Sequence, residues 1–278
     1  MLKIHKIQAR DLPDLWFQAV HDILEHGKRF VIDRGSYAGQ TRLEYDYFIG
    51  HILDPGHGSG TAEILPQIPA SIGIPNPVEV DYVYGGEGYT RSYIEYVMTA
   101  TKEKGESYTY GQRLTGYPVP HAIIHRMVEN EDCYVDDEIM QNAKLITYSL
   151  RLLNQIEMII HIYKTHGYRN NQMILQIAKP DDCLLLDPPC LRHIDTRIQD
   201  DKLHFFVYFR SWDLWGGMPA NLAAIQALKE YMAMEIDVED EEMIVESKGL
   251  HLYGYAEDLA KLRCMKESGS YQSCFPKS

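Results

Sequence analysis

The part of the sequence that most constrains the fold is the run of strand-like stretches that begins at Met173. QMILQIA, CLRHIDTRI and KLHFFVYFR are rich in β-branched and aromatic residues, and the turn signals KPDD and QDD separate them. PANLAAIQALKEYMAM then predicts a helix with Pro219 at its start, and EMIVESKGLHLYGY predicts a return to strand. The second half of the chain is therefore expected to be rich in β-structure.

The first half has stronger helix signals. Residues 11–27 have Asp11 as a candidate N-cap, Pro13 near the first turn and apolar residues at helical spacing. Further helices are expected over 89–104 and 134–166, the second with room for a break, and RFVIDRG and TRLEYDYFIGHIL are each typical of a strand. Helices and strands that share one core predict an α+β fold in a single domain over 1–278.

Glycine and proline punctuate residues 54–88, which form the longest irregular region. We interpret this region as an ordered cover over an active site rather than as a linker between domains. Residues 265–278 are expected to form a C-terminal tail.

The charge balance excludes one class of function. Forty acidic against 27 basic residues give a net charge of −13, which argues against sequence-independent nucleic-acid binding because such binding needs a basic face. A nucleotide pocket with a few local arginines remains compatible with this balance.

The cysteines and the apolar runs indicate the compartment. The five cysteines form no C-x-x-C pair, and the N-terminus has no apolar signal region. No stretch approaches the 18 or so apolar residues of a membrane span. The sequence therefore predicts a cytoplasmic protein with reduced thiols and no membrane association.

Cys190 is a candidate nucleophile, because a thiolate close to a positive charge is reactive. Arg192 is too close in sequence to face the same way on a strand, whereas Arg210 on the next expected strand is able to approach the thiol. Pro188 and Pro189 fix the entry of the strand rigidly. The alternative is that Cys190 is an inert core residue.

Polar residues also follow the strand HFFVYFRS. Arg210 and Ser211 are suited to holding a phosphate, or Arg210 forms a surface salt bridge. Asp213 and Asn221 bracket a Gly-Gly turn, and the Asn221 amide offers a donor and an acceptor that suit the O4/N3–H edge of uracil. Asn221 as an ordinary capping residue is the alternative.

His251 and Tyr253 alternate on an expected strand, so both point to one face. They are candidates for binding a sugar hydroxyl, or are ordinary polar residues of a half-exposed strand. His121 and His125 lack a third ligand at metal spacing, so no metal site is expected.

Taken together, these motifs resemble the thymidylate synthase family, and more closely its archaeal-type branch. PPC resembles the family's Pro-Cys nucleophile motif, and FRSWDLWGGMPAN resembles its Arg-Ser-x-Asp…Gly-x-Pro-x-Asn segment. LHLY resembles the His-x-Tyr strand of the family, and YTYGQRL resembles its Tyr-Gly segment. DRG at 33–35 resembles the arginine loop that closes over the phosphate. The resemblance covers most of residues 10–260 and implies a large mixed β-sheet with flanking helices.

The resemblance also implies roles for individual residues. Cys190 would be the nucleophile that adds to C6 of the uracil, Asp213 would orient the one-carbon donor, and Tyr110 would belong to the active-site hydrogen-bond network. The remaining residues would bind the nucleotide, with Arg34, Arg210 and Ser211 at the 5′-phosphate, Asn221 at the base, and His251 and Tyr253 at the ribose.

The implied reaction is the reductive C5-methylation of dUMP to dTMP by a homodimer that packs through its sheet. The one-carbon donor would be methylene-tetrahydrofolate or methylene-tetrahydromethanopterin, since the tail lacks the family's closing segment. Asn221 favours dUMP, because family members that act on cytosine nucleotides carry Asp at this position. A pyrimidine nucleotide 5-hydroxymethylase and a non-catalytic nucleotide-binding homologue are the alternatives.

Two elements of the family pattern differ here. The two arginines that the partner subunit supplies to the phosphate correspond to Asn171 and Gln172, with Arg169 nearby as a candidate replacement. The family's catalytic glutamate has three candidates, namely Glu79, Glu87 and Glu95.

Overall fold

The computed structural model describes residues 1–33, 37–56, 89–129, 134, 146–147, 152–169 and 171–266. The expected cover over 54–88 therefore lies outside the described residues from 57 onward. The expected tail lies outside them from 267 onward.

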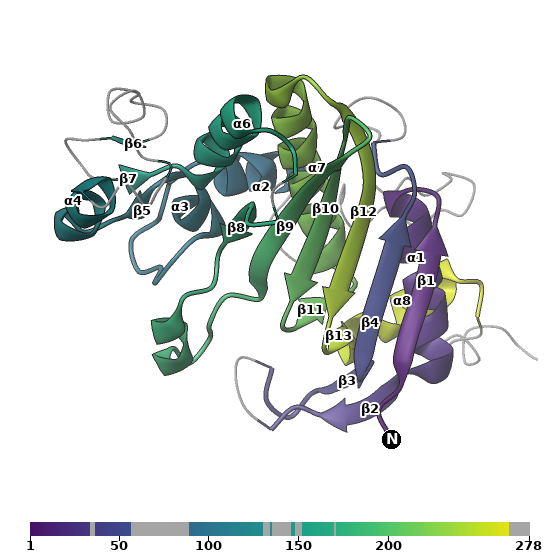
Figure 1. Cartoon of the computed structure of the whole chain (residues 1–278). Helices are drawn as coiled ribbons and strands as arrows, with labels where there is room; N and C mark the ends of the chain where they lie inside the picture. The colour runs from purple at the N-terminus through teal and green to yellow at the C-terminus, as the bar shows by residue number, and fades with distance from the viewer. Residues whose placement is uncertain are drawn as a thin grey trace, which may run out of the picture.

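A six-stranded mixed sheet forms the centre of the molecule (Figure 1). Two of its neighbouring strand pairs are parallel, β1 with β4 and β10 with β12, and the other three are antiparallel. The expected α+β class with a large mixed sheet is confirmed. In spatial order the strands are β1 (Ile4–Ala9), β4 (Tyr47–Ile52), β12 (Glu239–Ser247), β10 (Lys202–Phe209), β9 (Leu191–Gln199) and β8 (Ile174–Gln176).

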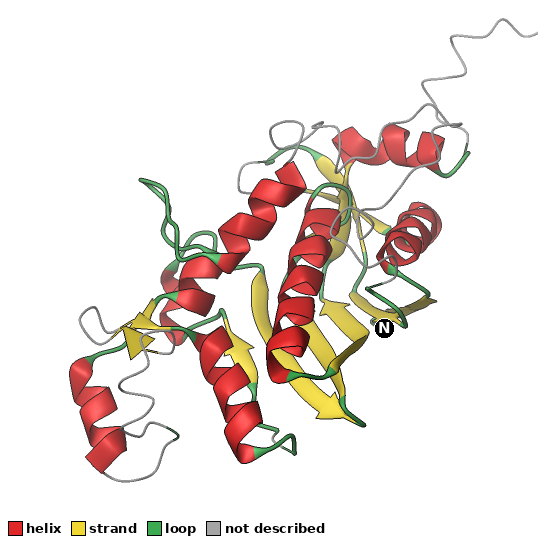
Figure 2. Ribbon diagram, turned by 90° about the horizontal axis from the view of Figure 1, so that it is seen from above, coloured by secondary structure: helices red, strands yellow, loops and turns green. Residues whose placement is uncertain are grey.

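Two helices, α1 (Leu12–His26) and α7 (Gly217–Ile236), cover one face of this sheet and lie behind it in Figure 1. The side chains of β10 alternate accordingly: Phe205 and Phe209 are buried, whereas Phe206 on the opposite face is 36% exposed. Figure 2 shows the helices and the sheet from above. The core lies between the sheet and these helices, and the other face of the sheet is only partly buried.

Helix α1 begins and ends where the sequence predicts. The Asp11 side chain accepts a hydrogen bond from the Asp14 N–H at 2.9 Å, and Pro13 lies in the first turn. The Trp16 indole N–H donates to the Leu214 carbonyl oxygen at 2.8 Å, and this bond is buried. Helix α1 is thereby attached to the segment that follows β10.

Two smaller sheets flank the main one. The expected strand TRLEYDYFIGHIL is in fact two strands, β3 and β4, which separate at Tyr45 and Asp46 and belong to different sheets. The four-stranded sheet consists of β11 (Trp212–Asp213), β13 (Leu250–Tyr253), β3 (Thr41–Glu44) and β2 (Lys28–Val31), and the three-stranded one of β5 (Tyr117–Pro118), β7 (Leu152–Leu153) and β6 (Ile146–Thr147).

Of the helix expected over 134–166, with room for a break, the described residues confirm the part from Gln155 to His166, and the helix is broken before that point. Leu152 and Leu153 form strand β7, and α6 starts only after Asn154, whose side chain caps the helix by accepting from the Glu157 N–H. No helix in the described part of the chain is long and apolar enough to cross a membrane. The other α-helices among the described residues are α2 (Tyr89–Met98), α3 (Tyr110–Thr115), α4 (His121–Glu129), α6 (Gln155–His166) and α8 (Glu257–Arg263).

Candidate active site

Cys190 ends the loop that leads into β9, and main-chain hydrogen bonds fix this position from two sides. The Arg210 N–H donates to the Cys190 carbonyl oxygen at 2.8 Å. The Leu191 N–H donates to the Tyr110 hydroxyl at 3.2 Å. The structure thus brings together Cys190, Arg210 and Tyr110, and the thiol is half-buried against the core.

The surroundings of the Cys190 thiol act on its pKa in opposite directions. Burial raises the pKa, Arg210 lowers it, the Asp187 carboxylate raises it and Arg192 lowers it, and the net result is a raised pKa. Arg210 acts as the sequence suggests, but burial has the larger effect. Arg192, expected to face away, reaches the site because a bulge interrupts the pairing of β9 with β10 at this point.

Asp187→Asn is expected to lower the pKa of Cys190, because it removes the carboxylate that disfavours the thiolate. At a fixed pH below that pKa, iodoacetamide should alkylate Cys190 faster in the variant, as measured by peptide mass mapping. Asp181→Asn is the matched control, since Asp181 is paired with Lys179 at 2.7 Å and does not act on Cys190. Alkylation of Cys190 that is unchanged or slower in the variant would refute this role of Asp187.

Helix α3 places Tyr110 beside the nucleophile. Thr109 caps the helix by accepting from the Gln112 N–H at 2.9 Å. Arg113, one turn further on, donates to Asp182 at 2.7 Å and to the Ile177 carbonyl oxygen at 2.9 Å. Both members of this ion pair are buried, with side chains 6% and 1% exposed. The pair ties α3 to the segment that precedes Cys190.

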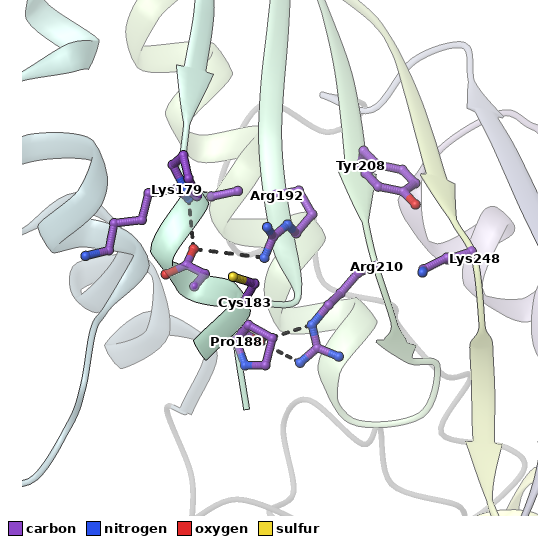
Figure 3. Close-up of a pocket in the computed structure, with 10 residues that line it drawn as sticks. Lys179, Cys183, Pro188, Arg192, Tyr208, Arg210 and Lys248 are labelled. Carbon is purple, nitrogen blue, oxygen red and sulfur yellow. Dashed lines mark hydrogen bonds and ion pairs between the residues drawn. The ribbon is translucent and has the colours of Figure 1, made fainter. Parts of the chain in front are cut away.

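Arg210 is hydrogen-bonded to the loop that precedes Cys190. Its guanidinium donates to the carbonyl oxygens of Pro188 and Pro189 at 3.1 and 3.2 Å, and it pairs with the exposed Asp187 carboxylate at 2.8 Å. Figure 3 shows its planar head turned toward Pro188 at the edge of a pocket. Ser211 follows directly and is half-buried.

Asp213 and Asn221 lie next to each other. Strand β11 pairs in parallel with β13, so that Asp213 lies beside His251. Gly217 sits between the two polar residues, because a Cβ at this position would lie 3.3 Å from the Asp213 Cβ and 3.7 Å from the Asn221 Oδ1. The absence of a Cβ at Gly217 leaves room for these two side chains.

Two hydrogen bonds fix the orientation of the Asn221 amide. The Trp212 indole N–H is only a donor, so the oxygen that accepts from it at 2.8 Å is Oδ1. The Asn221 Nδ2 then donates to the Tyr93 hydroxyl at 2.6 Å. Sequence reasoning missed Tyr93, which lies 128 positions away and carries no local signal.

His251 and Tyr253 share one face of β13, as expected, with ring centroids 4.6 Å apart. His251 is 3% exposed, and burial lowers its pKa to about 4, so the ring is neutral at pH 7. Its Nδ1 donates to the Gly249 carbonyl oxygen at 2.9 Å. The buried Nε2 is therefore an acceptor, and it has no hydrogen-bond partner among the described residues.

A cavity of about 400 Å³ lies beside the nucleophile loop. Tyrosines dominate its wall, and the Tyr96 hydroxyl donates to Glu106 at 3.0 Å. In size and in its aromatic faces it suits a planar ring system. The lining residues are Tyr93, Tyr96, Glu106, Ser107, Tyr108, Tyr110 and Asp187.

The family model described as thymidylate synthase matches residues 101–272, which is more than half of the chain. The chain belongs to the thymidylate synthase family. The matched residues include Tyr110, Cys190, Arg210, Asp213 and Asn221.

Archaeal relatives of this thymidylate synthase family member match over most of their length. A Methanosarcina mazei protein with the name "Putative thymidylate synthase" is 23% identical over 255 residues, 92% of each chain. A Methanococcoides burtonii protein of the same name is 25% identical over 249 residues, 90% of this chain and 89% of the relative. The thymidylate synthase of Pseudomonas fluorescens is 27% identical over 114 residues, 36% of this chain and 41% of the relative.

Two further residues that the family pattern suggests are Arg34 and Arg169. Arg34 lies outside the described residues. Arg169 lines a separate pocket with Asn171 and Arg197, at the far end of β9, roughly 25 Å along the strand from Cys190. Within one chain, Arg169 is therefore remote from the nucleophile.

The structure assigns none of the three glutamate candidates to the site. Glu95 is exposed on α2, and Glu79 and Glu87 lie outside the described residues. In the described part of the chain, no group of three or more His, Cys, Asp or Glu side chains is arranged to hold a metal ion.

Proposed function

We propose that this thymidylate synthase family member catalyses the reductive C5-methylation of dUMP to dTMP, with a methylene-tetrahydropterin as one-carbon donor. Two observations support the proposal: Arg210 is bonded to the main chain of Cys190, and the oriented Asn221 amide is bonded to Tyr93, which lines one cavity with Tyr110. Cys190, Arg210 and Asn221 supply a nucleophile, a phosphate-binding cation and a base reader.

The hydrogen bonds of Asn221 support uracil as the base. Trp212 and Tyr93 use one lone pair of Oδ1 and one N–H of Nδ2. One acceptor site and one donor remain, and they match N3–H and O4 of uracil. The amide cannot turn over without breaking both bonds.

The remaining polar groups support a nucleotide with a sugar hydroxyl and a phosphate. The His251 Nε2 is a buried acceptor with no partner among the described residues, which suits a ribose hydroxyl donor. Tyr253 lies against it, and Arg210 with Ser211 would bind the 5′-phosphate.

The proposed chemistry begins with the Cys190 thiolate, which adds to C6 of the uracil and moves electron density to C5 and O4. The free N–H of Asn221 stabilises the oxygen on which this charge develops. The reduced pterin supplies the one-carbon unit and the hydride when it is bound. Asp213 would orient it, and the tyrosine-lined cavity offers aromatic faces to its planar ring.

The product decides between methylation and hydroxymethylation. Purified protein is incubated with dUMP and either methylene-tetrahydrofolate or methylene-tetrahydromethanopterin, and the nucleotide product is analysed by mass. The proposal predicts dTMP with one of the donors. A product heavier by one oxygen would identify a hydroxymethylase, and unchanged dUMP with both donors would indicate a non-catalytic nucleotide-binding protein.

Asn221→Asp is expected to lower kcat/KM for dUMP by about 30- to 150-fold, because a mispaired buried polar contact costs about 2–3 kcal/mol. The loss for dCMP should be smaller, since a carboxylate accepts from the cytosine amino group. Asn154→Asp, the same exchange at the cap of α6, should leave both values unchanged. Equal losses for dUMP and dCMP would contradict base reading by Asn221.

We also propose that the protein is a homodimer that packs through the face of the main sheet opposite α1 and α7. Ile4 and Phe206 lie on this face, 60% and 36% exposed, and His193 and Tyr208 stack there with ring centroids 5.7 Å apart. A second copy of the chain would cover these side chains, as the family resemblance implies.

A further inference from the structure

Another pocket, of about 560 Å³, opens beside Arg210 (Figure 3). Lys179, Arg192, Arg210 and Lys248 line it together with a single acidic residue, Asp182. The Asp182 carboxylate is 1% exposed and is already neutralised by Arg113. Such a concentration of positive charge is unexpected in a chain with 40 acidic and 27 basic residues, and it favours an anion as the occupant.

The sheet itself places Lys248 next to Arg210. Strands β10 and β12 are parallel, and their last register pair is Phe209 with Ser247. Arg210 and Lys248 are the next residues along each strand, and neighbouring strands lie about 4.8 Å apart. Side chains alternate between the faces, so both residues leave the core on the same side as Tyr208. Figure 3 shows the Lys248 ammonium directed toward Tyr208 and Arg210.

Unlike the other cations of this pocket, Lys248 has no hydrogen-bond or ion-pair partner among the described residues. Arg210 is paired with Asp187 and Lys179 with Asp181, and Arg192 donates to the Pro189 carbonyl oxygen. Among the described residues, none forms a hydrogen bond or an ion pair with the exposed Lys248 ammonium. An incoming anion therefore gains this contact without breaking an existing ion pair.

We propose that Lys248 and Arg192, which line the pocket on either side of Arg210, complete the binding site of the nucleotide 5′-phosphate from within the same chain. This inference rests on the proposed function, in which Arg210 and Ser211 bind that phosphate. Asn171 and Gln172 stand where the family resemblance would place two arginines of the partner subunit, so the phosphate lacks two positive charges. Lys248 and Arg192 supply two charges at the pocket.

The added charge also has a consequence for the nucleophile. A phosphate dianion bound to Arg210 offsets the cation that favours the Cys190 thiolate. Lys248 compensates for the negative charge that the substrate brings. The cation thus serves both substrate affinity and the ionisation of the thiol.

Lys248→Gln should weaken dUMP binding about tenfold, the scale of one charge-assisted contact near solvent, and leave 2′-deoxyuridine binding unchanged. Titration calorimetry of both ligands gives the two dissociation constants. Lys248→Arg should restore most of the dUMP affinity. Lys164→Gln removes a positive charge from α6, where Lys164 donates to the Glu235 carbonyl oxygen, and should change neither constant.

Equal weakening of nucleotide and nucleoside, or unchanged dUMP binding, would overturn the role of Lys248. Inorganic phosphate provides a test that does not depend on the nucleotide: it should raise the Tm of the wild type more than that of Lys248→Gln. If phosphate raises the Tm of the wild type more than that of Lys248→Gln but dUMP does not bind, the anion site is supported and dUMP is refuted as the substrate. If dUMP binds, and if Lys248→Gln responds to dUMP and to phosphate as the wild type does, only the inference about Lys248 is refuted.

Discussion

Cys190→Ser is expected to lower turnover of dUMP by at least about 10⁴-fold, a loss typical of removing a nucleophile. A serine hydroxyl has the shape of the thiol, but it is far less acidic and adds poorly to C6 of the base. The main-chain contacts of residue 190 to Arg210 and of Leu191 to Tyr110 do not involve the thiol. The dissociation constant of dUMP should therefore stay within a few-fold of the wild-type value.

Cys264→Ser is the matched control for this experiment. Cys264 is half-buried after helix α8 and takes no part in the candidate site, so its replacement should leave turnover unchanged. Turnover is measured from the nucleotide product by mass, and binding by calorimetry. A Cys190→Ser variant with turnover close to that of Cys264→Ser would end the assignment of Cys190 as the nucleophile.

Arg113→Met is expected to lower the free energy of unfolding by about 3–5 kcal/mol, because it leaves the buried Asp182 carboxylate without its partner. The double variant Arg113→Met/Asp182→Leu should recover most of this loss, since it removes both charges. Urea unfolding at pH 7 gives the values. Arg29→Met breaks the exposed pair with Glu257 and should cost no more than about 1 kcal/mol.

The Arg113–Asp182 pair also predicts a pH dependence. Burial alone would raise the pKa of Asp182, but the hydrogen bonds from Arg113 and from the Lys179 N–H lower it overall. A carboxyl whose pKa is lower in the folded state stabilises the fold above its unfolded pKa of about 3.9, and this stability is lost as the pH falls below it. Arg113→Met should lose this part of the acid sensitivity. An Arg113→Met variant as stable as Arg29→Met would contradict the account.

The elements that the sequence predicts well are those with local signals. Asp11 and Pro13 mark the start of α1, and the turn residues between β9 and β10 mark a hairpin, in which Asp200 and Asp201 adopt positive φ values of 53° and 58°. The helix expected over 134–166 is broken before Gln155, because Leu152 pairs with Pro118, far away in the sequence. Asn154 and Glu157, by contrast, form a capping signal that marks the true start of α6.

In the candidate site, too, the residues with a local sequence signal are predicted and their remote partners are not. The motif residues Cys190, Arg210 and Asn221 are visible in the sequence because each offers a distinct chemistry. Their supporting contacts come from remote segments: Tyr93 lies 128 positions from Asn221, and Arg113 lies 69 positions from Asp182. No local pattern records such pairs, which arise only when α2 and α3 pack against the rest of the fold.

The adduct formed with 5-fluoro-dUMP tests the proposed mechanism most directly. The mass of the intact protein is measured after incubation with this nucleotide, with and without methylene-tetrahydrofolate, and then with methylene-tetrahydromethanopterin in its place. We predict a ternary adduct of protein, nucleotide and one-carbon donor with one of the donors, located on the Cys190 peptide. An adduct on another cysteine, or no adduct with either donor, would contradict the proposed reaction.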